Sequence, residues 1–381
     1  MLKSLQINNL LSFGPKSESV SLRPLNVLVG PNGSGKSNFL SAIRILQRIP
    51  DDVSQFWKSA NQPDDWFWSG NATENISLIV SFDEKIVYVL MFEKTYNEMT
   101  IDTEIIKTLE GGIVISRSGF NYQVFDGRVE RDLVVSNSLS DKRKSVLSQY
   151  RDSQEGIAAL QSSLTKIKIY SERPHGDRNF LRNPQSIDVA SDFLSEQFDN
   201  LPVVLHELNN KISIEALLLD KLQRFYPRVE KFYMGLVGPR AQVFFQERVG
   251  NRLMNVPASR LSDGTLSFLC LLTILCHPTP PPLICIEEPE LGLHPDVLPM
   301  IAELLVEASK RTQLIITTHS DLLVSAIGDL DPEAILVCEH TAEEGTTIER
   351  PNPERLKKWL QQDEMSLGEV WLRGAIGGTL Y

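Results

Sequence analysis

One eight-residue stretch, GPNGSGKS from Gly30 to Ser37, constrains the fold more than any other part of the chain. It matches the phosphate-binding pattern G-x-x-x-x-G-K-[ST] at every fixed position. The six residues 25–30 form a short apolar run typical of a buried strand, and apolar residues recur at helical spacing over 38–47. The sequence therefore predicts a strand, a phosphate-binding loop and a helix in direct succession.

The chemistry of such a loop assigns roles to its residues. Glycines let successive backbone N–H groups point at phosphate oxygens, and the helix adds its positive end. Lys36 is expected to reach the β- and γ-phosphates, and the Ser37 hydroxyl is expected to bind Mg²⁺. The alternative, a glycine-rich turn without a ligand, is disfavoured by the flanking strand and helix. The predicted nucleotide-binding residues are Asn32, Gly33, Ser34, Gly35, Lys36, Ser37 and Asn38.

A pair of carboxylates follows the apolar run Leu283 to Ile286. Open α/β sheets place their ligands at the carboxyl ends of strands, so both side chains are expected to lie at a ligand. Glu287 is the candidate to hold Mg²⁺ or its water. Glu288 is the candidate general base that polarises the water attacking the γ-phosphate. Because acidic residues often follow strands, this prediction depends on the phosphate-binding loop in the same chain.

Two further segments carry candidate site residues. The apolar run LIITTHS contains His319 at the end of an expected strand, where its side chain can hydrogen-bond the γ-phosphate; the alternative is a structural histidine. The segment LSDGT precedes an apolar helix and supplies Ser262, Asp263 and Gly264 at the start of that helix. These three residues are predicted to bind a phosphate, and the alternative is a plain helix cap.

The pattern of elements divides the chain into three parts. Residues 1–135 read mainly as strands, which predicts a lobe containing the phosphate-binding loop and an antiparallel β subdomain wrapped around its strand. Residues 136–233 read as an inserted helical lobe, and in residues 234–381 strands alternate with apolar helices, which completes the core. The predicted fold class is α/β with a mixed core sheet. The expected strands are 2–10, 25–30, 76–82, 86–92, 99–109, 112–116, 122–125, 283–286, 313–317 and 334–339, and the longest expected helices are 203–221, 265–276 and 297–310.

Charge and composition limit the partners. A formal net charge of -11 argues against a protein that coats nucleic acid through bulk electrostatics. The segment 141–182 nevertheless holds nine Lys or Arg against five Asp or Glu, a local charge of +4 that fits a solvated helical face or a surface for DNA phosphates. The four cysteines lie in apolar runs and are expected to be buried thiols. The sequence shows no membrane-spanning run and no signal-peptide core, so a cytoplasmic protein is expected.

The motifs GPNGSGKS, LSDGT, LICIEEPELGLHP and TTHS, in this order, resemble the Walker A, signature, Walker B with D-loop, and His-switch motifs of ABC-class ATPases. The opening LKSLQINNLLSFGP and the closing WLRGAIGG are similar to SMC/RecF-like AAA ATPases, the AAA-21 group related to the ATPase part of OLD-family proteins. The resemblance implies a P-loop NTPase fold of ABC type that binds ATP and Mg²⁺ and hydrolyses ATP. It assigns catalytic roles to Lys36, Glu288 and His319, and metal binding to Ser37 and Glu287.

The two phosphate-binding helix ends imply a dimer. The P-loop cradles the triphosphate of its own subunit, so Ser262 and Gly264 are expected to close over the γ-phosphate bound to a second copy. Such a homodimer forms on ATP binding and acts as a nucleotide-gated switch, which the resemblance places in DNA repair, recombination or phage defence. The alternative is an ATPase that regulates a separate effector protein without binding DNA. A nuclease is expected only as a partner, since 62 residues follow His319.

Overall fold

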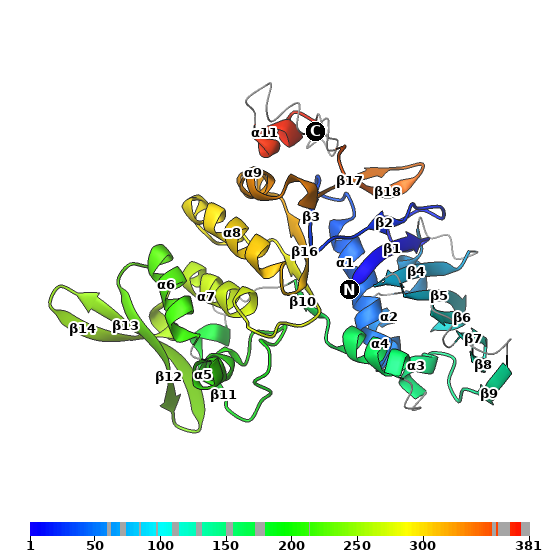
Figure 1. Ribbon diagram of the computed structural model, residues 1–381, viewed down its shortest axis with the longest axis horizontal. Coiled ribbons are helices and arrows are strands. Elements are labelled where there is room, and N and C mark those ends of the chain that lie inside the picture. The colour runs from blue at the N-terminus through cyan, green and yellow to red at the C-terminus, as the bar shows by residue number, and fades with distance from the viewer. Residues whose placement is uncertain are drawn as a thin grey trace. The chain divides into compact units, whose positions relative to one another are not determined.

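The computed structural model describes residues 1–58, 62–68, 74–83, 85–96, 98–108, 114–126, 132–149, 155–171, 180–212, 214–352, 356 and 366–374. The chain forms two compact units (Figure 1). Unit 1 comprises Met1–Ile167, Glu333–Met365 and Glu369–Tyr381, and unit 2 comprises Lys168–Pro332 and Ser366–Gly368. None of the helices in the described ranges combines the length and the apolar content needed to cross a bilayer.

Unit 1 contains an eight-stranded antiparallel sheet with the order β2-β1-β4-β5-β6-β7-β8-β9. Side chains alternate across it, so Tyr88, Leu90 and Phe92 of one strand are all fully buried on a single face. The β subdomain predicted from the sequence is confirmed, with two additional strands, β2 and β9. Its strands are β1 (Leu2–Asn8), β2 (Val20–Ser21), β4 (Ile76–Phe82), β5 (Ile86–Thr95), β6 (Glu98–Thr108), β7 (Val114–Ser118), β8 (Asn121–Asp126) and β9 (Asp132–Ser138).

The P-loop strand lies outside this antiparallel sheet and pairs instead with a strand from the last part of the chain. Strand β3 (Leu25–Val29) is buried throughout and pairs in parallel with β17 (Ile335–Thr341), which pairs antiparallel with β18 (Gly345–Glu349). Mostly apolar runs of this kind, here with one buried polar residue, Asn26, are typical of strands covered on both faces. The helices whose bounds fall in or border unit 1 are α1 (Lys36–Arg48), α2 (Ser54–Trp57), η1 (Pro63–Trp66), α3 (Val146–Gln149), α4 (Glu155–Thr165) and α11 (Leu367–Leu372).

A buried ion pair ties the β subdomain to the segment that follows it. Arg117 Nη1 lies 3.3 Å from Glu104 Oε2, and both side chains are 0% exposed. Arg117 also donates to the backbone oxygens of Lys142 and Lys144, at 2.8 and 2.6 Å. Tyr88 Oη donates to Glu104 Oε1 at 2.7 Å, and burial raises the pKa of this phenol well above its usual value. The paired charges are thereby hydrogen-bonded as buried ions require.

Unit 2 holds the parallel strands β10 (Lys168–Tyr170), β15 (Leu283–Glu287) and β16 (Gln313–Thr318), paired in that order. The predicted alternation of strands and apolar helices is confirmed here. Residues 314–316 of β16 are fully buried, and the neighbouring α7 is apolar almost all round. The helices of this part are α7 (Asp263–Leu275), η6 (Pro295–Val297), α8 (Leu298–Ala308), α9 (Asp321–Leu330) and η7 (Pro332–Ala334), the last of which runs on into unit 1. None of the four cysteines forms a disulfide, and all are buried.

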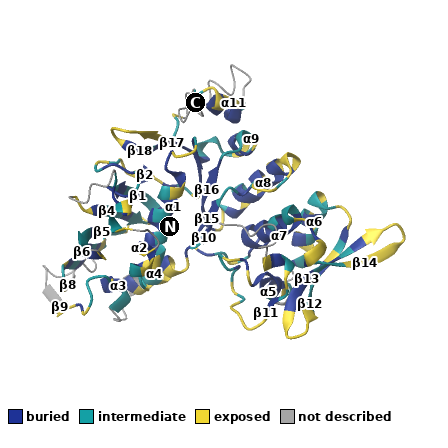
Figure 2. Ribbon diagram, turned by 180° about the vertical axis from the view of Figure 1, so that it is seen from behind, coloured by how far each residue is buried: buried dark blue, intermediate teal, exposed yellow. Residues whose placement is uncertain are grey.

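A smaller antiparallel sheet completes unit 2. It consists of β11 (Gln185–Ser186), β12 (Val229–Val237), β13 (Arg240–Val249) and β14 (Arg252–Pro257), with α5 (Leu201–Ile212) and α6 (Glu215–Phe225) packed on β12. The helix expected over 203–221 is thus two helices. Short strands and the η4 turn (Phe180–Arg182) also lie in the stretch read as helical. The outer parts of β13 and β14 are exposed (Figure 2).

Candidate functional site

The loop between β3 and α1 has the backbone that its glycines predict. Gly33 and Gly35 have φ values of +80° and +99°, in the left-handed region that glycine adopts without strain. A Cβ atom on Gly35 would collide with the Thr346 hydroxyl. The turn therefore depends on glycine at this position, and it leads directly into the first turn of α1.

Lys36 is buried inside this loop, at 6% exposure. Its Nζ donates to the backbone oxygens of Gly30 and Pro31, both at 2.8 Å, and lies 3.4 Å from Ser34 Oγ. The ammonium group thus occupies the centre of the curl of backbone that the sequence predicts to hold phosphates. The side chain of Ser37 is exposed on the first turn of α1, and Asn32 and Gly33 are exposed at the tip of the loop.

A hydroxyl network beside the loop was not predicted from the sequence. Asn38 Nδ2 donates to Ser12 Oγ at 2.7 Å, and Thr346 Oγ1 donates to the same oxygen at 2.8 Å. Thr346 Oγ1 also lies 3.1 Å from the backbone oxygen of Ser34. The predicted nucleotide-binding residue Asn38 is therefore bonded to Ser12 in the turn after β1, and Ser12 is in turn bonded to Thr346 of β18.

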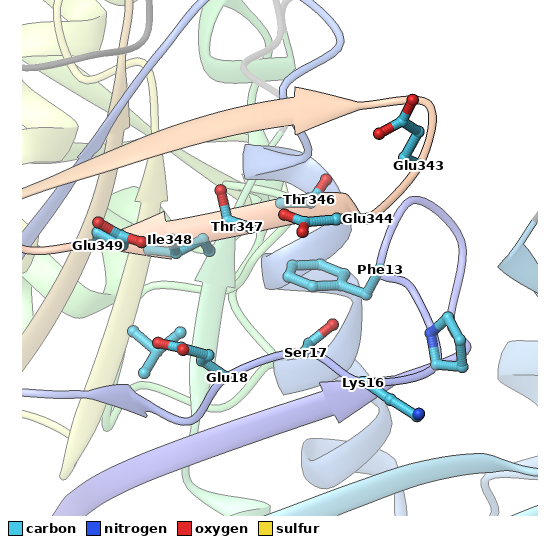
Figure 3. A pocket seen from close by; sticks show the side chains of 12 residues that line it. Phe13, Lys16, Ser17, Glu18, Glu343, Glu344, Thr346, Thr347, Ile348 and Glu349 are labelled. Atoms are coloured by element: carbon cyan, nitrogen blue, oxygen red, sulfur yellow. The ribbon is translucent and has the colours of Figure 1, made fainter.

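The same two segments enclose a cavity of about 390 Å³ (Figure 3). Phe13 and Thr346 contribute to its lining, as do Glu18, Glu344 and Glu349. Figure 3 shows the side chain of Phe13, which belongs to the loop after β1, lying beside β18. Because Thr346 contacts the P-loop backbone, this cavity adjoins the phosphate-binding loop.

The carboxylate pair lies at the end of β15, as predicted. Glu287 is the last residue of the strand, and Glu288 follows it with a φ of +46°. A residue with a side chain rarely adopts this left-handed conformation, and such outliers cluster at functional sites. The backbone N of Glu288 donates to the Thr317 oxygen at 2.9 Å, which extends the pairing with β16. The turn projects the Glu288 side chain toward the end of that neighbouring strand.

His319 follows β16 and lies beside the carboxylates. Its Nε2 is 3.6 Å from Glu288 Oε1, with both side chains about one-third exposed. Glu290 Oε1 accepts hydrogen bonds from Thr318 Oγ1 at 2.5 Å and from the backbone N of His319 at 3.2 Å. Burial raises the pKa of Glu290. The sequence did not identify Glu290 as a site residue, although it stands within the EEPE run.

The LSDGT segment forms the N-terminus of α7. Ser262 caps the helix, because its Oγ accepts a hydrogen bond from the Thr265 backbone N at 3.1 Å. Asp263 is paired with a guanidinium group, that of Arg182, at 2.8 Å. A Cβ atom on Gly264 would lie 2.8 Å from the backbone oxygen of Gly292, so the helix approaches the LGLHP turn closely.

Several charges of the basic segment 141–182 are paired within the protein. Arg143 donates to both carboxylate oxygens of Asp141 and to Glu98, and Lys142 lies 3.8 Å from Glu93. These pairs reduce the positive charge available to an external partner. Arg151, Arg173 and Arg178, which also belong to this segment, lie outside the described residues.

Each unit therefore brings together part of the predicted site. Unit 1 holds Asn32 to Asn38, while unit 2 holds Glu287, Glu288 and His319 together with the start of α7. Within the described ranges, the His, Cys, Asp and Glu side chains form no group of three or more that could hold a metal ion. The Ser37 hydroxyl and the Glu287 carboxylate are nevertheless oxygen donors of the kind that Mg²⁺ prefers beside nucleotide phosphates.

Comparisons with known proteins identify the family of the chain. The family model described as "AAA domain, putative AbiEii toxin, Type IV TA system" matches residues 25–325. The Old nuclease of Escherichia phage P2 is 23% identical, over 94% of this chain and 62% of its own length. The DNA repair protein RecN of Synechocystis sp. is 22% identical, over 68% of this chain and 43% of its own length. The chain thus spans less than two thirds of each of these relatives.

A solved structure confirms the fold class. The head domain of an SMC protein, bound to the C-winged helix domain of ScpA, superimposes with a TM-score of 0.54. The match has 16% sequence identity and covers 93% of this chain and 99% of the other. The chain therefore has the α/β P-loop fold of ABC-type ATPases, as the motifs predicted.

Proposed function

The chain belongs to the AAA-domain family whose model matches residues 25–325, and we propose that it acts as a nucleotide-gated switch. In this proposal, ATP binding closes two copies into a dimer, and hydrolysis opens the dimer. The observation that carries this proposal is the pair of helix N-termini suited to phosphate, one at α1 and one at α7. The α1 end begins in the curled loop around Lys36, while the α7 end presents Ser262 exposed. One triphosphate held at α1 leaves the α7 end for the γ-phosphate of a second copy.

Binding is proposed to begin with an exchange of partners at Lys36. Its ammonium now bonds the backbone oxygens of Gly30 and Pro31. Phosphate oxygens are stronger acceptors for an ammonium group than backbone carbonyls are, so the β- and γ-phosphates draw Lys36 from the loop. Ser37 and Glu287 are the residues proposed as ligands of Mg²⁺, which would supply positive charge to offset that of the phosphates.

Hydrolysis is proposed to depend on Glu288 and His319. The Glu288 carboxylate accepts a proton from the water that attacks the γ-phosphorus, which makes this water a better nucleophile. His319 lies within 3.6 Å of the same carboxylate and is suited to hydrogen-bond the γ-phosphate at the moment of attack. Cleavage of the γ-phosphate removes the group that both copies share, and the dimer then opens.

We further propose a role in DNA repair, recombination or phage defence. Its support is the likeness to the Old nuclease of phage P2 and to a RecN repair protein. The alternative is regulation of a separate effector, such as a partner nuclease, without DNA binding. The ion pairs of Arg143 with Asp141 and of Lys142 with Glu93 favour this alternative, because they occupy charges that DNA phosphates would need.

Sedimentation of the Glu288→Gln variant tests the switch. This variant is expected to bind ATP without hydrolysing it, and therefore to sediment as a monomer alone and as a dimer with ATP and Mg²⁺. Lys36→Ala in the same background is the control, since loss of phosphate binding is expected to leave a monomer in both conditions. A Glu288→Gln protein that binds ATP and remains monomeric overturns the proposal.

ATP turnover measured with DNA separates the two roles. For a DNA-associated ATPase, turnover rises with DNA and the rise falls steeply between low and moderate salt, because phosphate contacts release counterions. Reversing the charges of Lys142, Arg143 and Lys144 then removes the rise. If no form of DNA changes ATP turnover, in either the wild type or the charge-reversed variant, the result supports the effector role.

A further inference from the structure

The side chain of Arg182 bonds to residues at the N-terminus of α7. Arg182 is the last residue of η4, and its Nε and Nη2 both donate to Asp263 Oδ1, at 3.0 and 2.8 Å. Its Nη1 donates to the backbone oxygen of Ser259 at 3.1 Å. The guanidinium group thus binds the residues before and within LSDGT, although 81 residues separate it from Asp263 in the sequence.

The backbone of Arg182 is fixed by the small antiparallel sheet. Its carbonyl oxygen accepts a hydrogen bond at 2.6 Å from Nε2 of Gln242, a buried residue of β13. Three residues further along, Gln185 of β11 pairs with Ala241 of the same strand. A side chain whose base is held in this way loses little entropy when it orders a loop, so the contact is preorganised.

Asp263 poses an electrostatic problem for the proposed role of α7. A carboxylate in the first turn stabilises the positive end of a helix, but it also repels a triphosphate that approaches the same end. The pairing with Arg182 balances this charge and holds the Asp263 side chain at a fixed place. Both side chains are partly exposed, at 28% and 38%, so the pair lies where an approaching anion experiences its charge.

From this geometry we infer that Arg182 is the positioning residue of the segment LSDGT. It holds Asp263 and cancels its charge, so that the N-terminus of α7 accepts the γ-phosphate bound to a second copy of the chain. This inference rests on the proposed function. It assigns a role in that function to a residue that lies outside all of the sequence motifs. Arg182→Lys is expected to act only in part, because a lysine lacks the fork that binds Asp263 and Ser259 together.

The test uses four variants of the full chain in the Glu288→Gln background: Arg182→Gln, Asp263→Asn, the two combined, and Arg248→Gln. The dimer dissociation constant with ATP is measured by sedimentation over a range of protein concentrations. Arg182→Gln is expected to weaken the dimer roughly tenfold or more, because the uncovered Asp263 repels the phosphate. The combined variant is expected to recover to within about threefold of the parent, since it removes both charges.

Two readouts guard against an effect on folding alone. Binding of a fluorescent ATP analogue to the monomer, which depends on the P-loop of unit 1, is expected to be unchanged in every variant. Arg248→Gln breaks a comparable exposed pair with Glu230 in the same small sheet and is expected to leave the dimer unchanged. A merely structural role for Arg182 predicts no recovery in the combined variant.

The outcomes distinguish a failure of this inference from a failure of the proposed ATP-dependent dimer. If the parent dimerises with ATP and Arg182→Gln has no effect, or its defect persists in the combined variant, the inference is overturned alone. If the parent binds ATP and stays monomeric, the proposed function is overturned and the inference with it. A defect in Arg182→Gln that Asp263→Asn repairs supports both.

Discussion

His319 Nε2 lies 3.6 Å from Glu288 Oε1, which joins the ends of β16 and β15 through their side chains. The backbone N of His319 donates to Glu290 Oε1, so carboxylates of one short segment lie beside the ring of the histidine and bind its main chain. Their proximity follows from the parallel register, in which Glu287 pairs with Thr317. Glu288 and His319 are therefore expected to act as a unit.

The first prediction concerns the coupling of these two residues. Glu288→Gln is expected to lower ATP turnover by about 10²- to 10⁴-fold, the usual contribution of a general base. His319→Ala is expected to lower turnover as well, and the double variant is expected to be no slower than Glu288→Gln alone, because residues that act as a unit are not additive. Steady-state ATP hydrolysis measures all three. If the losses of turnover in the two single variants multiply in the double variant, the coupling is contradicted. Glu303→Gln, on the surface of α8, is the matched control and is expected to leave turnover unchanged.

The second prediction concerns the close approach of α7 to the LGLHP turn. A methyl group at Gly264 meets the backbone oxygen of Gly292, so Gly264→Ala is expected to shift the start of α7 and to cost about 1–3 kcal/mol. ATP-driven dimerisation in the Glu288→Gln background is expected to be lost while nucleotide binding by the monomer persists. Gly250→Ala is the control for a loss of stability alone: no atom lies within 4 Å of a Cβ placed there, but the φ of +59° is strained for alanine, so this variant is expected to lose stability and still dimerise. A Gly264→Ala protein that dimerises normally contradicts the role given to this helix end.

Local patterns were sufficient to predict the elements that carry the motifs. The buried strands β3, β15 and β16 are mostly apolar runs, and α1 has a clear apolar face, so their positions could be predicted from the hydrophobic pattern. Short elements such as β2, β10 and β11 escaped prediction, because two or three residues carry no period. The break between α5 and α6 was missed for a related reason, since apolar residues continue across it.

Contacts between distant segments could not be predicted from one sequence. Thr346 lies 312 residues from Ser34, whose backbone oxygen it contacts, and Arg182 lies 81 residues from Asp263. Neither Arg182 nor Thr346 lies in one of the sequence motifs, so no local signal marks them. Ser262 shows the opposite case: its capping bond to Thr265 is the plain alternative that the sequence left open, and it coexists with an exposed helix end.

The third prediction concerns the ion pair enclosed by the β subdomain. Arg117→Met leaves Glu104 buried without its cation and is expected to lower the free energy of unfolding by about 3–5 kcal/mol. Lys94→Met removes a partly exposed pair with Asp64 and is expected to cost less than about 1 kcal/mol. Thermal melting of both variants measures the difference. Equal melting temperatures contradict the importance of this buried pair.

The last prediction concerns the pH dependence of stability at His277, which lies just after α7. The residue is buried, its Nδ1 accepts a hydrogen bond from the Thr279 backbone N at 3.2 Å, and its ring lies 5.2 Å from that of Phe193. Burial lowers the pKa of His277 below its usual value of 6.5.

Above pH 6.5 this histidine is neutral in both the folded and the unfolded chain, so its contribution to stability is fully present. As pH falls below 6.5 the unfolded chain binds a proton before the folded chain does, and stability is lost until pH reaches the lowered pKa. The melting temperature of the wild type is therefore expected to fall between pH 7.5 and pH 5.5, and to fall less in His277→Gln. The exposed His294→Gln is expected to leave the wild-type drop unchanged. If the melting temperature falls equally in the wild type and in His277→Gln, the pH dependence of stability comes from other titratable groups.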